Sequence, residues 1–162
     1  MLVVRDATAD DWPAIWRVMK PIVEAGETYA LDTEMTEEAG RRSWMGGEGV
    51  RTVVAELDGE VAGTANGYAN REGNGAHIAS GSFMIGRDNL GQGVGRALGE
   101  DLIAWARYAG FRGIQFNAVV ETNAPAVALW KSLGFEIVGT VPEAFEHPRE
   151  GFIGLHVMYR AL

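Results

Sequence analysis

Near the start of the chain, hydrophobic residues follow a helical spacing. They recur every three or four positions over residues 13–24, and Gly26 ends the run. A second, shorter helix is predicted from the capping residue Thr36 to about Trp44. Between the two helices, residues 26–32 have no regular spacing, so they predict a loop.

Apolar runs later in the chain predict strands. Two of these runs flank Asp58-Gly59, which is a two-residue turn signal for a hairpin. Helical spacing returns twice, each time between strands and each time ended by a glycine. The strands are predicted at residues 3–4, 51–57, 60–68, 77–85, 113–120, 135–141 and 152–159, with a polar loop between the last two. The later helices are predicted at residues 94–109 and 123–133.

This order of elements predicts an α/β fold. Hairpin strands followed by strand–helix–strand units form a mixed sheet with helices on both faces. The chain has 162 residues, no repeats and no segment that reads as a linker. We therefore expect residues 1–162 to form a single domain.

Composition and charge narrow the classes of function. The absence of cysteine excludes disulfides, thiolate metal sites and a cysteine nucleophile, and it allows a reducing cytoplasm. With 14 basic and 22 acidic residues the net charge is −8, which disfavours nucleic acid and anionic membranes as partners. Acidic residues come too early for a signal peptide, and no apolar run could span a bilayer. We expect a soluble, cytoplasmic protein with a small partner and no metal.

The stretch Ser82–Arg96 is the most informative part of the sequence. A strand stops at Gly86, a polar turn follows, and alternating glycines then lead into a helix. Backbone N–H groups left open by glycine, together with the free N–H groups of a helix start, favour a phosphate ligand. A P-loop is disfavoured because no Gly-Lys pair occurs, and a dinucleotide site is disfavoured because the third glycine comes one residue early. The alternative is a tight turn without a ligand.

Two motifs resemble those of the GCN5-related N-acetyltransferase family. Gly93 and Gly95 fill the glycine positions of its acyl-CoA loop, with Leu90 where Gln or Arg is usual. The segment Asn123–Phe135 is similar to a second family motif, with Trp130 in place of its tyrosine. The resemblance implies a fold in which acyl-CoA enters between two diverging strands, 77–85 and 113–120. It also implies acetyl-CoA as co-substrate and direct attack by an amine in a ternary complex.

The resemblance assigns the acyl-CoA contacts. Backbone groups of Phe83, Met84 and Ile85 are expected to pair with the pantetheine arm, and one of their N–H groups, with Met84 among the candidates, to polarise the thioester. Asn123 is expected to bind the pantetheine or to act as a helix N-cap. Trp130 is expected at the cofactor but without the tyrosine's proton, because an indole N–H does not ionise near neutrality. The phosphate cradle is expected to comprise Gly91, Gln92, Gly93, Val94, Gly95 and Arg96.

The catalytic residues are less sharply indicated. Glu27 and His77 are both candidates for the base that takes the amine's proton, and either could instead face solvent. Glu27, Thr28 and Tyr29 resemble the substrate-side loop of small-amine acetyltransferases, which favours Glu27. Asn117 stands six residues before Asn123. This spacing resembles fungal proline-analogue acetyltransferases, in which such an Asn lies at the reacting centre. The competing role for Asn117 is that of a buried structural hydrogen-bonding group.

These features predict an N-acetyltransferase that moves an acetyl group from acetyl-CoA to the amine of a small molecule, an amino acid or an analogue of one. The alternative is a non-catalytic acyl-CoA-binding or regulatory domain, which the departures Leu90 and Trp130 would explain. Acetylation of proteins is disfavoured, since nothing in the sequence indicates a peptide groove. Members of the family often pair through their C-terminal strands, so a homodimer is expected.

Overall fold

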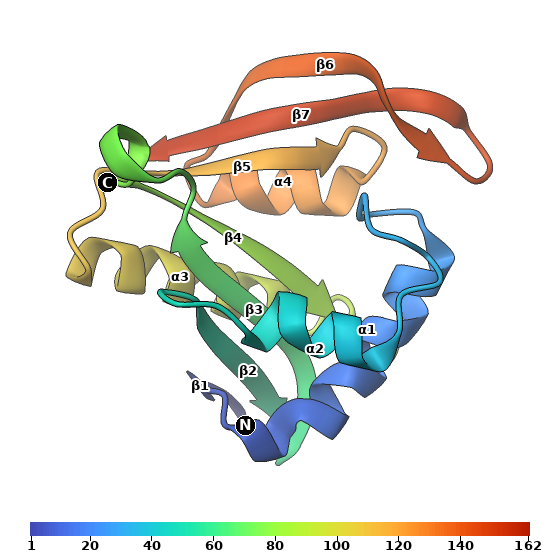
Figure 1. Cartoon of the computed structure of the whole chain (residues 1–162), viewed down its shortest axis with the longest axis vertical. Coiled ribbons are helices and arrows are strands. Elements are labelled where there is room, and N and C mark those ends of the chain that lie inside the picture. The colour runs from blue at the N-terminus through green and yellow to red at the C-terminus, as the bar shows by residue number, and fades with distance from the viewer.

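The computed structural model describes residues 1–162. All strands belong to one seven-stranded sheet in the order β1-β2-β3-β4-β5-β7-β6 (Figure 1). The strands are β1 (Leu2–Asp6), β2 (Arg51–Leu57), β3 (Glu60–Ala69), β4 (Ile78–Ile85), β5 (Gly113–Val120), β6 (Glu136–His147) and β7 (Gly151–Ala161). The α-helices are α1 (Trp12–Ala25), α2 (Glu37–Met45), α3 (Val94–Tyr108) and α4 (Ala124–Ser132).

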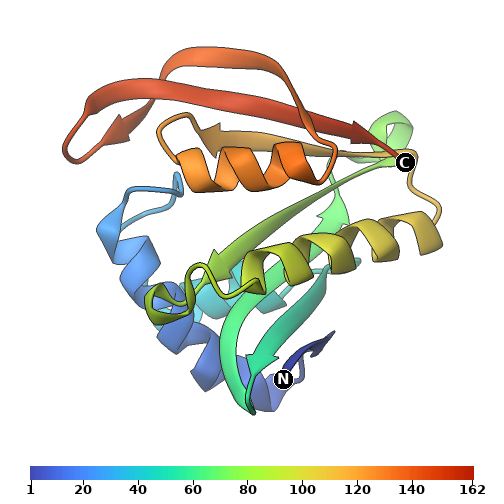
Figure 2. The same cartoon turned by 180° about the vertical axis from the view of Figure 1, so that it is seen from behind.

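Helices cover both faces of the sheet, as the pattern predicted. The helices α1 and α2 lie on the face seen in Figure 1, and α3 and α4 lie on the face seen in Figure 2. Successive residues of a strand point to opposite faces, so β4 contributes to two cores. Phe83 packs in the cluster beneath α3 and α4, whereas Met84 packs in the cluster beneath α1. The mixed α/β architecture is confirmed.

The sheet divides between β4 and β5. These parallel neighbours pair only at Ile78 with Gly113 and at Ala79 with Ile114. Beyond these two pairs β4 stays with β3 and β5 stays with β7, so the two halves of the sheet diverge (Figure 1). The divergence predicted for these strands is therefore present. We call the space between residues 80–85 and residues 115–120 the β4–β5 gap.

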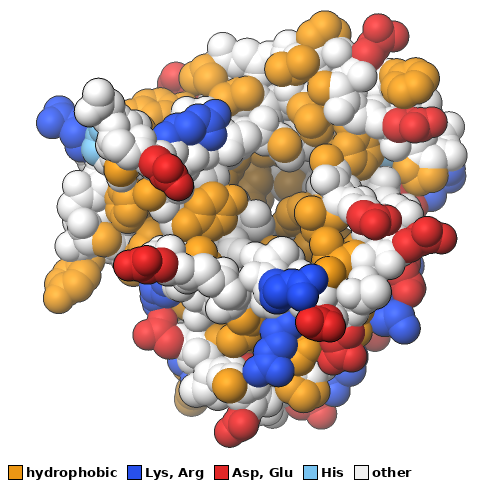
Figure 3. Space-filling model, in the orientation of Figure 1, with side chains coloured by type: hydrophobic (Ala, Val, Ile, Leu, Met, Phe, Trp, Pro, Cys, Tyr) orange, Lys and Arg blue, Asp and Glu red, His pale blue; other side chains and the backbone are white.

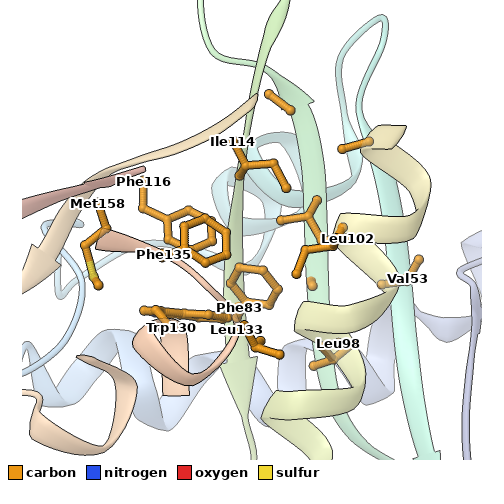
Figure 4. Packing of buried hydrophobic residues seen from close by; sticks show 14 of the residues in the cluster. Val53, Phe83, Leu98, Leu102, Ile114, Phe116, Trp130, Leu133, Phe135 and Met158 are labelled. Carbon is orange, nitrogen blue, oxygen red and sulfur yellow. The ribbon is translucent and has the colours of Figure 1, made fainter. Parts of the chain in front are cut away.

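Aromatic side chains fill the side of this gap that faces α3 and α4. Trp130 of α4 packs at a tilt against Phe83 of β4 and Phe116 of β5, with ring centroids 4.6 Å and 4.8 Å away (Figure 4). Phe135 lies against Phe116, with centroids 4.5 Å apart. Burial of large aromatic surfaces is strongly stabilising, so this cluster joins the two halves of the sheet where no backbone pairing does.

Glycines bring α3 and α4 close together. A Cβ atom built on Gly99 would lie 2.7 Å from Leu133 Cδ1 and 3.0 Å from Trp130 Cζ3. A Cβ on Gly95, one turn earlier, would lie 3.1 Å from Leu129 Cδ2. Only residues without side chains allow this approach. The helix that starts at the phosphate loop is thus packed directly on the helix that carries Asn123 and Trp130.

The C-terminal hairpin is longer than the sequence predicted. Residues 142–147 were expected in a polar loop, but they continue β6. Proline and charged residues suit this position because β6 is the edge strand of the sheet. The pairing with β7 shifts in register between Val141 and Phe145, where Glu143 has a φ of 54°. Edge strands tolerate such bulges. The bulge interrupts the alternation of apolar and polar residues, so the sequence pattern did not predict that β6 continues to His147.

None of the helices combines the length and the apolar character that crossing a bilayer requires.

Candidate active site

The β4–β5 gap forms a hollow in the surface. Figure 3 shows it at the centre of the face covered by α1 and α2, with hydrophobic side chains on its walls. Its closed end lies at the two β4–β5 pairs, and it opens toward Ile85 and Val120, the last residues of the two strands. An extended ligand can therefore lie against the edge of β4 as an added strand would.

The exposed edge of β4 presents the peptide groups of alternate residues. Gly86 N–H donates to Ala62 O of β3 at 2.8 Å, and Phe83 N–H donates to the Tyr29 hydroxyl at 3.0 Å. Since peptide groups alternate sides along a strand, those of Phe83 and Ile85 face the gap and those of Met84 face β3. Met84, one of the predicted thioester polarisers, is thus directed away, and its buried side chain packs under α1. Phe83 and Ile85 remain as candidates.

The glycine loop leads into the N-terminus of α3. Gly93 is the N-cap residue with a φ of 83°, a left-handed conformation that glycine adopts without strain. The first helical hydrogen bond runs from Ala97 N–H to Gly93 O at 3.0 Å. The preceding N–H groups have no helical acceptor, so they and the positive end of the helix dipole form an anion site. The residues that supply these N–H groups are Val94, Gly95 and Arg96.

The side chains around this cradle differ in what they can contribute. Val94 is buried, so only its backbone can meet a ligand. Gln92 donates to Asp88 O at 2.9 Å, which holds the turn. Arg96 donates to Ser132 Oγ at 2.8 Å and stays half-exposed beside the cradle, where its charge favours a phosphate. Leu90, in the position where the family has Gln or Arg, is 64% exposed. The cradle is therefore mainly a backbone site.

Two residues of the second motif take different roles. Asn123 precedes α4, but its side chain makes no capping hydrogen bond. The amide is therefore available to a ligand, which favours the cofactor role over the N-cap role that the sequence left open. Trp130 is buried among Phe83, Phe116 and Phe135, and it serves chiefly to pack the core beside the gap.

Asn117 lies at a bulge in β5. The pairing of β5 with β7 shifts between Phe116 and Val119, so Asn117 and Ala118 have no regular partners. The Asn117 amide donates to Asn70 Oδ1 at 2.6 Å and accepts from Gln115 Nε2 at 3.0 Å. Asn117 is exposed rather than buried, so the alternative of a buried structural group is wrong. The bulge leaves the Asn117 side chain exposed, and the hydrogen bonds to Asn70 and Gln115 hold its amide in place.

Glu27 is held by a partner that the sequence analysis did not identify. Arg149, in the turn between β6 and β7, donates to the Glu27 carboxylate. This hydrogen bond, more than the nearby charges of Arg149, His147 and Arg87, lowers the pKa of the Glu27 carboxyl. A lowered pKa makes Glu27 a weaker base, so the structure favours an electrostatic role over proton abstraction.

The loop of residues 26–36, which contains the predicted substrate-side residues, lies beside β4 and the end of β6. It rises from α1 toward the β6–β7 turn (Figure 1). A cavity of about 200 Å³ lies between the loop and the end of β6, lined on one side by Tyr29 and Leu31 and on the other by Phe145 and Glu146. Thr28 is partly buried in the same loop. Of the three residues predicted to bind the substrate, Tyr29 contacts Phe83 and Glu27 contacts Arg149.

His77 lies elsewhere. It immediately precedes β4 and lines a separate hollow of about 470 Å³ with Arg112 and Tyr159. That hollow lies where β4 and β5 pair, at the closed end of the gap. His77 is six residues before Phe83, which corresponds to about 20 Å along an extended strand. His77 is therefore not placed to take a proton from an amine at the gap.

The model of one protein family matches most of the chain. The acetyltransferase (GNAT) family model aligns with residues 10–135, which include both motifs. The chain belongs to the acetyltransferase (GNAT) family.

Relatives and solved structures of the GNAT family agree with this assignment. A structure of a GCN5-related N-acetyltransferase from Kribbella flavida is 59% identical and superposes with a TM-score of 0.95 over 99% of this chain and 98% of that one. The L-methionine sulfoximine/L-methionine sulfone acetyltransferase of Pseudomonas paraeruginosa is 30% identical over 86% of this chain and 83% of its own. A phosphinothricin acetyltransferase from Sinorhizobium meliloti in complex with AcCoA is 25% identical, with a TM-score of 0.87 over 99% and 88% of the two chains.

This GNAT protein is an acetyltransferase that uses acetyl-CoA. Its residues fit that co-substrate: a cradle of free N–H groups lies at one end of the gap, and peptide groups of β4 that have no neighbouring strand line its length. No three His, Asp or Glu side chains come together as a metal site would require.

Two features of the site had no signal in the sequence. Arg149 sits in a polar turn that reads as an ordinary hairpin end, and nothing in its spacing relates it to Glu27. His147 is buried, and its Nδ1 accepts the N–H groups of Arg149 and Glu150, each at 3.2 Å. The ring thus fixes the turn that presents Arg149. The burial of His147 could not be predicted from the pattern of hydrophobic residues, because the residues around it are mainly Pro, Glu and Arg.

Proposed function

We propose that the protein transfers the acetyl group of acetyl-CoA to the amine of a small molecule, an amino acid or an analogue of one. One observation carries the proposal: the β4–β5 gap has a phosphate cradle at α3, and at its other side the 26–36 loop both borders a small cavity with β6 and forms the Glu27–Arg149 ion pair with the β6–β7 turn. A carboxylate and a guanidinium within one ion pair suit a ligand that carries both an ammonium and a carboxylate.

The known relatives support an amino-acid class of acceptor. One relative is named for methionine sulfoximine and methionine sulfone, and a structural neighbour is a phosphinothricin acetyltransferase. The cavity of about 200 Å³ is of a size that suits a small acceptor rather than a polypeptide chain. The carboxylate of such an acceptor would replace Glu27 on Arg149, and the amine would face the gap.

The reaction needs a donor for the charge that develops on the carbonyl oxygen. Acetyl-CoA supplies an acetyl thioester, and the amine nitrogen bonds to its carbonyl carbon as the carbon–sulfur bond breaks. The N–H of Phe83 or Ile85 faces the gap and can stabilise the carbonyl oxygen. Asn117, exposed at the bulge in β5, is a second donor at the reacting centre.

Proton transfer need not use a strong acid. The sulfur leaves as a thiolate, which is tolerable because thiol pKa values lie near about 8.5. This fits the presence of Trp130 in place of a tyrosine. The proton of the amine passes to water, because Glu27 has a lowered pKa and His77 is remote.

A thiol-release assay tests the proposal. We expect acetyl-CoA to be turned over with one or more members of a panel containing methionine sulfoximine, methionine sulfone, phosphinothricin and proline analogues. Calorimetry of acetyl-CoA alone provides the control. Binding without turnover on every amine would instead support the non-catalytic acyl-CoA-binding alternative.

Glu27 is expected to act in recognition of the amine. Glu27→Gln removes the negative charge, so KM for the acceptor should rise by roughly ten- to a hundredfold, the range for a charge-assisted hydrogen bond. Because the Glu27 pKa is already lowered, the carboxylate is ionised throughout the neutral range. The variant should therefore keep the pH dependence of the wild type between pH 6 and 9. A lost or shifted pH limb in that range would identify Glu27 as the general base instead.

We also propose a homodimer through the C-terminal hairpin. β6 is the edge strand of the sheet, its side chains are mostly exposed, and Val138 and Val141 are 61% and 53% exposed. An unpaired edge with exposed valines suits pairing with a second copy. Light scattering at micromolar concentration should return twice the chain mass, and Val138→Lys should shift it toward the monomer. A monomer mass for the wild type would refute the dimer.

A further inference from the structure

The hydroxyl group of Tyr29 occupies the edge of β4. It accepts a hydrogen bond from Phe83 N–H at 3.0 Å and donates to Phe83 O. Tyr29 belongs to the 26–36 loop, far from β4 in the sequence, and its ring packs beside the α1 core. One side chain thus satisfies both peptide groups that Phe83 presents to the gap, as a neighbouring strand would.

These two peptide groups lie where an acyl-CoA has to bind. The gap begins where β4 and β5 cease to pair, and within it Gly81, Phe83 and Ile85 turn their peptide groups outward from β4, with Phe83 the central one of the three. A ligand added along this edge needs them, because its amides can pair only with unpaired strand groups. The Tyr29 hydroxyl and the ligand therefore compete for the same N–H and C=O of Phe83.

We propose that Tyr29 is a self-capping residue: its hydroxyl closes the β4 edge in the free enzyme, acetyl-CoA displaces it, and the displacement repositions the loop that carries Glu27. The inference uses only the acetyl-CoA site and goes beyond the identity of the acceptor amine. It makes the 26–36 loop respond to the co-substrate before the acceptor arrives.

The state of the hydroxyl suits this role. Burial raises the pKa of Tyr29, so the group keeps its proton and can donate to Phe83 O while it accepts from Phe83 N–H. A phenylalanine would retain the ring and its packing but make neither bond. Loss of the hydroxyl therefore leaves the β4 edge open while the ring still packs beside the α1 core.

The position of Glu27 links the two sites. Glu27 lies two residues before Tyr29 in the same loop, and it is tied to Arg149 of the β6–β7 turn. When the Tyr29 hydroxyl leaves Phe83, the loop is held by fewer bonds, and Glu27 can exchange Arg149 for an ammonium. Acetyl-CoA should thus bind first, and the acceptor site should form as a result.

The decisive variant is Tyr29→Phe, measured by calorimetry with acetyl-CoA. Removal of the competing hydroxyl should tighten binding by roughly three- to tenfold, the equivalent of one net hydrogen bond. Tyr108→Phe is the matched control, because Tyr108 is 95% exposed at the end of α3 and should bind like the wild type. Equal or weaker binding by Tyr29→Phe would overturn the proposal, since a residue that merely contacts the ligand weakens binding when removed.

Hydrogen exchange of the unaltered enzyme gives an independent test. Adding CoA should raise exchange in the 26–36 loop while it keeps Phe83 N–H protected, because the ligand replaces Tyr29 as its partner. In Tyr29→Phe without ligand, the Phe83 amide should exchange at least tenfold faster than in the wild type. A loop that becomes more protected on adding CoA would contradict displacement.

Different results would contradict the acyl-CoA site, the proposed function and the role of Tyr29. No acetyl-CoA binding by the wild type would contradict the acyl-CoA site itself. Binding without turnover on any amine would contradict the proposed function and leave the Tyr29 result intact. Unchanged affinity in Tyr29→Phe, in an enzyme that turns over, would refute only the self-capping role.

Discussion

Asn117→Ala is expected to lower turnover by roughly ten- to a thousandfold, the range observed when one transition-state donor is removed. The reason is the bulge in β5, which leaves the Asn117 amide at the edge of the gap with Asn70 and Gln115 as its only side-chain partners. Acetyl-CoA affinity should change little, because the N–H groups of the cradle belong to α3 and none of them depends on Asn117. Initial rates and calorimetry on the same preparation provide the measurement.

Asn70→Ala is the matched control for this variant. It removes the same 2.6 Å hydrogen bond from the other side but leaves the Asn117 amide in place. If the amide itself acts on the reacting centre, Asn70→Ala should slow turnover only a few-fold. Both changes are at exposed hydrogen bonds, so each should alter unfolding free energy by less than about 1 kcal/mol. Equal losses of activity in the two variants would assign Asn117 a positioning role only.

Gly93→Val is expected to abolish acetyl-CoA binding at millimolar concentration. Gly93 has a φ of 83°, which a β-branched residue adopts only with strain, and its side chain would enter the space that a pyrophosphate needs. The fold should survive, since the nearest atom to a Cβ at this position is Leu2 Cδ2 at 4.0 Å. Calorimetry measures the loss of binding, and circular dichroism measures the fold.

Gly110→Val is the control that distinguishes the effect of backbone strain from the effect of filling the phosphate cradle. Gly110 follows the other end of α3 with a φ of 85°, and a Cβ there would meet nothing within 4 Å. The two variants therefore bear a similar backbone penalty of about 1–3 kcal/mol, but only one lies at the cradle. Gly110→Val should bind acetyl-CoA normally. Binding that survives in Gly93→Val would show that the loop is only a turn.

The fold was largely predictable because its local signals agree with its tertiary arrangement. Asp58-Gly59 turns the hairpin with φ values of 53° and 88°, and Thr36 caps α2 by accepting from Ala39 N–H at 3.2 Å. Each signal depends on a residue's own backbone preferences. The end of β6 was missed because Pro142 and the charges around it are tolerated only at a sheet edge. Whether a strand lies at the edge depends on the assembled sheet, so it cannot be predicted from a short stretch of sequence.

The site was predictable where function depends on backbone, and less so where it depends on contacts between distant segments. Gly93 and Gly95 indicate the cradle from the sequence alone. In contrast, the Glu27–Arg149 ion pair joins residues 122 positions apart in the sequence, and the Tyr29–Phe83 hydrogen bonds join residues 54 positions apart. The preference for Glu27 over His77 as the base came from a resemblance; the geometry removes His77 from the gap, but the ion pair with Arg149 also makes Glu27 a weaker base.

The close approach of α3 and α4 limits how this enzyme can be stabilised by engineering. Replacing a helical glycine by alanine commonly raises stability by about 0.4–1 kcal/mol, because it restricts the unfolded chain. At Gly99 the added methyl group would instead meet Leu133 and Trp130 within 3.0 Å. Relief of that clash would push α4 outward and carry Trp130 away from Phe83. A thermostability programme should therefore leave Gly99 unchanged and look for its gains at exposed positions remote from this helix pair.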